Sequence, residues 1–164
     1  MNNIYLKEMT NKMYHEYYKE YQNDPDLYLD KGEFFEYVYT KEKVDQYIEK
    51  QKNLKRVCLA IMLDDCMIGE IKFYDLKNGC TNLGISLKND KYKNRGFGTI
   101  AEKLAIYYAF NKLKMHTIFA HSVLTNTRSQ HVLEKVGFKF YKQDEKYKYY
   151  KIERWVHLSI HIQS

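Results

Sequence analysis

The spacing of the apolar residues changes near residue 96, and this change restricts the fold more than any other feature of the sequence. Before it, the apolar runs 56–63, 66–76 and 80–88 have the length and composition of strands. After it, one helical stripe is formed by Phe97, Ala101, Leu104, Ala105 and Tyr108. The apolar run 116–124 then predicts a further buried strand. A helix between two strands favours a parallel connection with a right-handed crossover.

The remaining segments complete a mixed α/β sheet with antiparallel flanks. Asp64 and Asp65 predict a hairpin turn, which would place Cys58 opposite residue 71. The other expected elements are a strand at 3–8, a helix at 11–22 capped by Thr10, a helix capped by Thr40 that runs to about residue 52, a helix at 126–136, and strands at 138–143 and 149–162. No linker, repeat or low-complexity tract interrupts the chain, so we expect residues 1–164 to form one domain.

Composition and charge exclude several classes of protein. The 164 residues are 45% apolar and 29% charged, which is typical of a globular protein rather than a disordered one. No apolar stretch approaches the roughly 18 residues of a membrane span, and the first residues lack the apolar core of a secretion signal. The three cysteines form no CxxC pair, so we expect a reducing, cytoplasmic location without a disulfide framework or zinc site. The net charge of +6 attracts anions, among them nucleic acid, phosphorylated cofactors and anionic lipid.

The segment between the strand run 80–88 and the long helix carries the clearest chemical signal. A helix N-terminus has unpaired N–H groups and a partial positive charge, and together these suit phosphate. Gly96 and Gly98 let the backbone curl and a ligand come close, while Lys93 and Arg95 add positive charge. A loop with two glycines also occurs in ordinary turns. The segment matches neither the GxGxxG dinucleotide fingerprint nor the P-loop.

Residues 93–98, KNRGFG, and residues 126–138, NTRSQHVLEKVGF, are the most specific motifs of the chain. Together they resemble the acyl-CoA loop and the NxxSxxVLEKxGF segment of the GNAT acetyltransferase superfamily, with Lys93 at the place of the loop's first Arg or Gln. The resemblance covers about residues 56–162. It is closest to the branch that acts on ribosomal-protein N-termini, polyamines and small amines, and it implies the GNAT fold with splayed central parallel strands.

That resemblance implies a binding site for acetyl-CoA. In the family, the pantetheine arm pairs with the splayed strand as an added strand would, which here places it beside residues 83–87. An N–H group of that strand can polarise the thioester carbonyl, and the loop amides would hold the pyrophosphate. The Asn126 amide would meet the arm, cap its helix, or do both. The implied cofactor-binding residues are Ile85, Ser86, Leu87, Lys93, Asn94, Arg95, Gly96, Phe97, Gly98, Thr99, Asn126 and Ser129.

The resemblance also implies direct attack of a neutral amine on the thioester, assisted by a base and an acid. Two residues common in the family are replaced, because Asn82 stands where many members have a Glu base and Leu133 where many have a Tyr acid. The remaining catalytic candidates are Ser129 as the acid and Glu70 and His121 as bases, and alternative acids on the last strands are Tyr141, Tyr147, Tyr149 and Tyr150. Each of them also has an ordinary structural interpretation, as a helix residue or a core residue of a strand.

The expected acceptor is a primary amine on a small molecule, a polyamine or a peptide N-terminus. The acidic residues that could give its entrance a negative charge are Asp24, Asp26, Asp30, Glu33 and Glu36. Two alternatives stay open: a catalytically weak or inactive acyl-CoA-binding protein, and a nucleic-acid binder that uses the Lys and Tyr residues of 141–155. His157 and His161 would be roughly 13 Å apart on a strand, so we expect no metal. We expect no membrane partner, and a homodimer is compatible with the resemblance.

Overall fold

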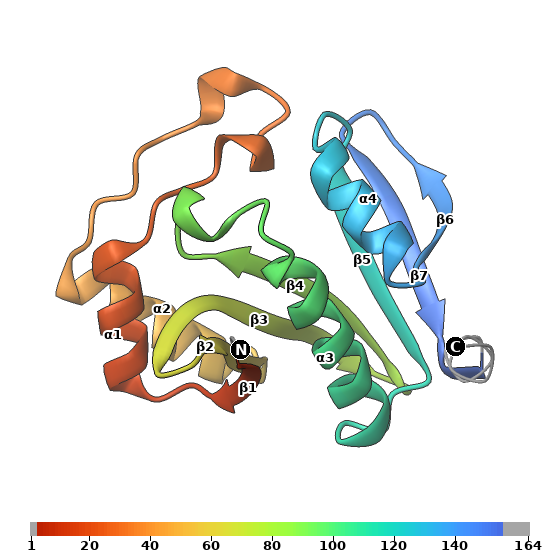
Figure 1. Ribbon diagram of the computed structural model, residues 1–164, viewed down its shortest axis with the longest axis horizontal. Helices are drawn as coiled ribbons and strands as arrows, with labels where there is room; N and C mark the ends of the chain where they lie inside the picture. Colours follow the sequence, from red (N-terminus) through yellow and green to blue (C-terminus); the bar gives the residue numbers. More distant parts are fainter. Residues whose placement is uncertain (1–2, 156–164) are drawn as a thin grey trace.

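Within residues 3–155, which the computed structural model describes, seven strands form one mixed sheet with helices on both faces (Figure 1). The strands are β1 (Ile4–Glu8), β2 (Val57–Leu63), β3 (Cys66–Lys77), β4 (Cys80–Leu87), β5 (Thr117–Val123), β6 (Lys139–Gln143) and β7 (Tyr147–Glu153). Their order in the sheet is β1-β2-β3-β4-β5-β7-β6. In this sheet β4 and β5 are parallel, and all other neighbouring pairs are antiparallel. The predicted mixed α/β sheet with antiparallel flanks is therefore confirmed.

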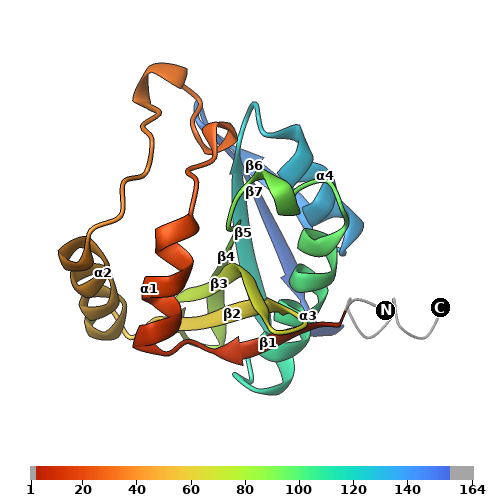
Figure 2. The same cartoon turned by 60° about the vertical axis from the view of Figure 1, so that its left-hand side comes forward.

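The helices form two layers, with α1 and α2 on one face of the sheet and α3 and α4 on the other (Figure 2). The helices are α1 (Asn11–Glu20), α2 (Lys41–Asn53), α3 (Phe97–Asn111) and α4 (Thr127–Lys135), with short 3-10 turns η1 (Pro25–Leu27), η2 (Lys31–Glu33) and η3 (Asp90–Tyr92). Thr10 and Thr40 start α1 and α2, because each hydroxyl accepts the backbone N–H three residues later at 3.2 Å. Among the described residues, no helix has both the length and the apolar character needed to cross a bilayer.

Two predictions about the strands are wrong in detail. The sequence predicts a last strand over 149–162, whereas β7 begins at Tyr147 and ends at Glu153. Residues 154 and 155 are helical, and 156–162 lie outside the described residues. Cys58 pairs with Lys72 rather than with residue 71, because a bulge at Ile68 adds one residue to β3.

The parallel contact between β4 and β5 is short, and this splits the sheet into two halves. Residues 80–82 pair with residues 117–119, and there the parallel ladder ends. Beyond Asn82, β4 continues to Leu87 paired on one side with β3, while β5 continues to Val123 paired with β7. The two strands therefore diverge towards the top of Figure 1. The edge of β4 from Leu83 to Leu87 is left without a strand partner on its β5 side.

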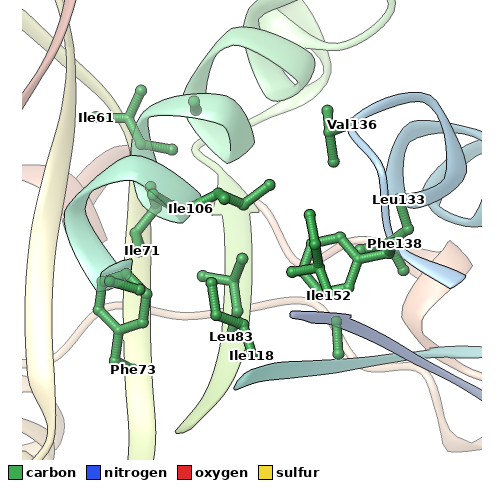
Figure 3. Close-up of a cluster of buried hydrophobic side chains, with 14 of the residues drawn as sticks. Ile61, Ile71, Phe73, Leu83, Ile106, Ile118, Leu133, Val136, Phe138 and Ile152 are labelled. Carbon is green, nitrogen blue, oxygen red and sulfur yellow. The ribbon is translucent and has the colours of Figure 1, made fainter. Parts of the chain in front are cut away.

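The helix α3 packs against both halves of the sheet and stabilises the angle between them. Ala101, Ala105 and Ala109 have 0% exposure, and their small side chains let the helix approach the strands closely. One buried cluster joins the halves, with side chains that converge beneath α3 and α4 (Figure 3). The cluster includes Ile61, Ile71, Phe73, Leu83 and Ile106 together with Ile118, Leu133, Val136, Phe138 and Ile152. Burial of each large side chain here contributes roughly 1.5–3 kcal/mol to the free energy of folding. The core that joins the two halves therefore stabilises the splayed arrangement of the sheet.

The close packing of β3 against β4 predicts the effect of one added methyl group. A Cβ at Gly69 would lie 2.5 Å from the Ser86 carbonyl oxygen and 2.8 Å from Ile61 Cδ1. Gly69→Ala should therefore lower the free energy of unfolding by about 1–3 kcal/mol in urea titrations. Gly84→Ala is the matched control, because its Cβ would have no neighbour closer than 3.8 Å. Equal stability of the two variants would contradict this packing.

Candidate functional site

The unpaired edge of β4 leads directly into the N-terminus of α3. Gly96 precedes α3 with φ of 81°, a left-handed conformation that favours glycine, and it supplies no side-chain cap. The first turn of α3 also contains no acidic residue. Its unpaired N–H groups and the positive end of the helix dipole are therefore free to bind an anion. A Cβ at Gly96 or Gly98 would meet nothing within 4 Å, so there is open space beside this turn.

Three cavities surround the divergence of β4 from β5, and Ile85 lines all three. The loop cavity, of about 350 Å³, lies between the edge of β4, the turn 93–99 and α4. The splay cavity, of about 270 Å³, lies between β4 and β5 and reaches Ser129 and Leu133 of α4. The β3 cavity, of about 280 Å³, is lined by residues of β3 and β4 that include Glu70 and Ser86. A ligand along β4 could therefore reach from the start of α3 to Glu70.

The loop cavity brings together most of the residues that the sequence predicts to bind the cofactor. The predicted residues that line it are Ile85, Ser86, Leu87, Lys93, Asn94, Gly96, Gly98, Thr99, Asn126 and Ser129. Two predicted side chains are placed elsewhere, because Phe97 is buried in the core and the exposed Arg95 guanidinium lies 4.9 Å from the Phe97 ring centroid. At these two positions the backbone alone faces the turn.

Asp24 joins the two walls of the loop cavity. Its Oδ2 lies 3.0 Å from Lys93 Nζ, beside the start of α3, and 2.8 Å from the Arg128 guanidinium on α4. Burial alone raises the pKa of Asp24, but the N–H of Asp26 and the ammonium of Lys93 outweigh it and lower that pKa. Lys93 also contacts Asp90, so its charge is already shared between two carboxylates.

The start of α4 leaves one amide group and one hydroxyl facing the cavities. Asn126 is buried, and its Oδ1 accepts the N–H of Ser129 at 3.0 Å, so it does cap the helix. Among the described residues, neither Nδ2 of Asn126 nor the hydroxyl of Ser129 forms a hydrogen bond. Both residues line the loop cavity and the splay cavity. The predicted arm-binding amide and the predicted acid therefore lie together.

Glu70 is a buried carboxylate held by tyrosines. It is 4% exposed, pairs with Ser86 across the β3–β4 ladder, and accepts hydrogen bonds from Tyr18 at 2.9 Å and Tyr47 at 3.1 Å. Burial raises its pKa, while the nearby Lys72 ammonium and the two hydroxyls act against that rise. A carboxylate with a raised pKa next to an open strand edge is suited to accept a proton.

His121 is separate from Glu70. It is an exposed residue of β5 that lines the splay cavity, and its ring lies 4.8 Å from the Tyr147 ring centroid. Desolvation lowers its pKa although Asp144 opposes the change, which favours the neutral imidazole near pH 7. No group of three or more His, Cys, Asp or Glu in the described part of the chain is placed to hold a metal. His157 and His161 lie outside that part.

Several residues of these cavities are not identified by the sequence analysis. The tyrosines around Glu70 belong to α1 and α2, and the signal that could reveal them is the recurrence of Tyr14, Tyr17, Tyr18 and Tyr21 at helical spacing. Arg56 and Lys72 line the β3 cavity, and Glu102 of α3 lines both other cavities. A single Glu next to Lys103 in a predicted helix is typical of a surface position. The sequence pattern therefore does not indicate that Glu102 is buried beside these cavities.

Comparisons with known proteins agree with this arrangement. Residues 3–139 match the family model of the acetyltransferase (GNAT) domain. The uncharacterized N-acetyltransferase YnaD of Bacillus subtilis strain 168 is 27% identical over 124 residues, which cover 73% of this chain and 70% of that protein. The probable N-acetyltransferase YjcK of the same organism is 31% identical over 102 residues, which cover 60% of this chain and 56% of that protein.

Solved structures share the fold at low sequence identity. Aminoglycoside acetyltransferase AAC(6')-Ib in complex with coenzyme A has a TM-score of 0.78 and 16% identity, and the match covers 97% of this chain and 99% of that chain. A chimera of the spermidine N-acetyltransferase SpeG from Vibrio cholerae and hSSAT has a TM-score of 0.77 and 15% identity, with 94% and 98% coverage. These likenesses show that the overall fold is shared.

The ion pairs of Asp24 predict a pH-dependent contribution to stability. Asp24→Asn should lower the free energy of unfolding at pH 7 by about 1–2 kcal/mol, because it removes a half-buried carboxylate that two cations contact. The pKa of Asp24 is lowered from 3.8, so its contribution is present above that pH and is lost as the pH falls below it. Urea titrations at pH 7 and pH 3 should therefore show a smaller difference at pH 3.

The control is Asp90→Asn. Asp90 also contacts Lys93, but its side chain is 82% exposed, so this change should cost about 0–1 kcal/mol. If Asp24→Asn is no more destabilising than Asp90→Asn at pH 7, Asp24 does not join the two walls.

Proposed function

The chain belongs to the GNAT acetyltransferase family, and we propose that it transfers an acetyl group from acetyl-CoA to a primary amine. The observation that carries this proposal is the uncapped N-terminus of α3 beside the unpaired edge of β4, with the loop cavity along both. A phosphate group and an extended polar arm need these two features side by side. We also propose that the reaction takes place in the cytoplasm and that residues 1–164 act as one domain.

The residues of the loop cavity fit acetyl-CoA. The open space beside Gly96 and Gly98 is a cradle that any side chain there would fill. The N–H groups of the first turn of α3 would hold the pyrophosphate, the edge of β4 from Leu83 to Leu87 would hold the arm, and Asn126 would offer its free Nδ2. When bound, acetyl-CoA supplies an activated thioester.

The chain's own residues would then move protons. An N–H of the β4 edge polarises the carbonyl that the amine attacks. Glu70 removes a proton from the incoming amine, directly or through water, since it is buried beside Ser86 and its pKa is raised by burial. The hydroxyl of Ser129, which has no partner among the described residues, would protonate the CoA thiolate that leaves when the new amide bond forms. His121 is the second candidate base.

Direct attack without an acetylated enzyme agrees with the state of the cysteines. Cys58 lies among Tyr14 and Glu70, where burial raises the pKa of its thiol and disfavours the nucleophilic thiolate. Cys66 and Cys80 donate hydrogen bonds to backbone carbonyls at 3.8 Å, and neither lines any of the three cavities.

The charges around the β3 cavity favour an acceptor that carries an anionic group in addition to its amine. Arg56 and Lys72 line this cavity, and in the described residues neither forms a salt bridge with a carboxylate. The Arg56 guanidinium is held by Gln51 Oε1 at 3.2 Å and by the Tyr74 ring. The acidic residues expected at the entrance are partly neutralised, since Asp24 and Asp26 pair with Arg128 and Glu33 pairs with Lys146.

The pyrophosphate site predicts opposite effects on folding and on binding at one position. A Cβ at Gly98 would meet nothing within 4 Å, and Ala and Glu both have higher helix propensity than Gly, so Gly98→Ala and Gly98→Glu should fold with the melting temperature of the wild type or higher. Gly98→Glu brings a carboxylate to the phosphate position and should weaken CoA binding at least ~tenfold, which is about 1.4 kcal/mol. The CoA affinity of Gly98→Ala should lie between the affinities of the wild type and Gly98→Glu. Isothermal titration calorimetry measures all three proteins, and unchanged affinity in folded Gly98→Glu would exclude this site.

The proton-transfer roles predict distinct kinetic changes. Ser129→Ala should lower kcat by roughly 10²-fold with little change in KM, whereas Glu70→Gln should lower kcat/KM by a similar factor. Because Glu70 must be ionised and its pKa is raised above 4.5, kcat/KM for the amine at saturating acetyl-CoA should rise with pH, and Glu70→Gln should lose the lower part of that rise. Steady-state kinetics with both substrates varied should give intersecting lines. Parallel lines together with an acetylated cysteine in mass spectra would contradict direct transfer.

The acceptor class is tested with two amines of equal length. 5-Aminovalerate, which has a carboxylate at its far end, should have a higher kcat/KM than 1,5-diaminopentane. Lys72→Gln should reduce that preference about tenfold, the effect of losing one charged hydrogen bond, and Arg56→Gln should act in the same direction. Lys77→Gln, an exposed change on the same strand, is the control. A wild-type preference for the diamine would contradict the anionic acceptor.

A further inference from the structure

Glu102 is a buried acid without a partner. Its side chain is 3% exposed, and its buried Oε2 has no hydrogen-bond partner in the described residues. In the described part of the chain it forms no hydrogen bond and no ion pair. An unsatisfied buried polar group costs about 1–3 kcal/mol, and a glutamate is rarely buried unless something binds it.

The position of Glu102 on α3 relates it to the ligand rather than to the core. It lies one turn after Gly98, on the same side of α3 as the cradle at the start of that helix. It lines both the loop cavity and the splay cavity. A ligand that runs from the start of α3 along the edge of β4 therefore passes Glu102 between its phosphate end and its reacting end.

We propose that Glu102 binds the pantetheine arm of acetyl-CoA by donating a hydrogen bond to an amide carbonyl of that arm. This inference rests on the proposed function, because it assumes that acetyl-CoA occupies the loop cavity. The arm carries two amides, and each needs partners when it leaves water. Ligand binding would then satisfy a group that the free protein leaves unpaired.

The protonation of Glu102 agrees with a donating role. Burial raises its pKa to about 8, so at pH 7 the carboxyl group carries a proton that it can donate. The charged or titratable groups that line the same two cavities are Asp24, Lys93, Arg128, Lys135, His121, Tyr21, Tyr74 and Tyr147. Lys93 and Arg128 both pair with Asp24, and in the described residues none of these groups forms an ion pair or hydrogen bond with Glu102.

The experiment compares two ligands by calorimetry. CoA has the arm, whereas adenosine 3′-phosphate 5′-diphosphate has the pyrophosphate without it. Glu102→Met, which keeps the volume but cannot hydrogen-bond, should bind CoA about fivefold more weakly at pH 7, as expected for about 1 kcal/mol. Its affinity for the second ligand should equal that of the wild type. Glu102→Gln can still donate and should bind both ligands as the wild type does.

Stability and pH separate this role from a structural one. Without ligand, Glu102→Met should raise the melting temperature, because it removes an unpaired buried group. Above pH 8 the wild type loses the proton that it donates, so its affinity for CoA should fall with pH, whereas that of Glu102→Gln should not. Lys103→Met, at the exposed neighbouring position on α3, is the control for changes to this helix and should leave both affinities unchanged.

Three results would overturn the inference. Wild-type affinity for CoA in Glu102→Met means that no hydrogen bond reaches the arm. If Glu102→Met loses affinity equally for both ligands and has a lower melting temperature, Glu102 stabilises the fold instead. If the wild type binds neither ligand, the proposed function fails, and the inference fails with it.

Discussion

The short parallel ladder between β4 and β5 is the constraint on which the rest of this structure depends. Three residue pairs join β4 to β5, and beyond them each of the two strands pairs only with its antiparallel neighbour, while one buried core joins the two halves of the sheet. Backbone groups at a sheet edge need partners, and edges that remain open bind further strands or extended ligands. The same divergence leaves room for cavities on both sides of Ile85. The fold therefore creates the binding edge and the space beside it together.

Some polar groups around this edge have hydrogen-bond or ion-pair partners in the protein, and others have none. Glu70 accepts two tyrosine hydroxyls and Asp24 contacts two cations, so both carboxylates are stabilised by the protein itself. The carboxyl group of Glu102, the hydroxyl of Ser129 and Nδ2 of Asn126 have no partner in the described residues, and all three residues line the loop cavity. Unpaired groups gathered along one cavity are typical of a binding surface, where the ligand completes the hydrogen bonds.

The sequence predicts the order of elements and the turn 93–99 because both depend on local spacing. The change in apolar spacing at residue 96, the two glycines and the caps at Thr10 and Thr40 are local signals. In the structure α3 begins at Phe97, directly after Gly96, and Thr10 and Thr40 cap α1 and α2. Contacts between distant segments are not local. The bulge that pairs Cys58 with Lys72, the pairing of Lys93 with Asp24, and the burial of Glu102 depend on tertiary packing, so the pattern of residues alone does not reveal them.

Hydrogen–deuterium exchange tests the central claim most directly, because it reports on the backbone of β4 itself. With CoA, the amides of residues 83–87 and 96–99 should exchange more slowly than in the free protein, since the arm pairs with the open edge and the pyrophosphate with the first turn of α3. With adenosine 3′-phosphate 5′-diphosphate, protection should be confined to 96–99. CoA-dependent protection that leaves residues 83–87 unchanged would contradict the account.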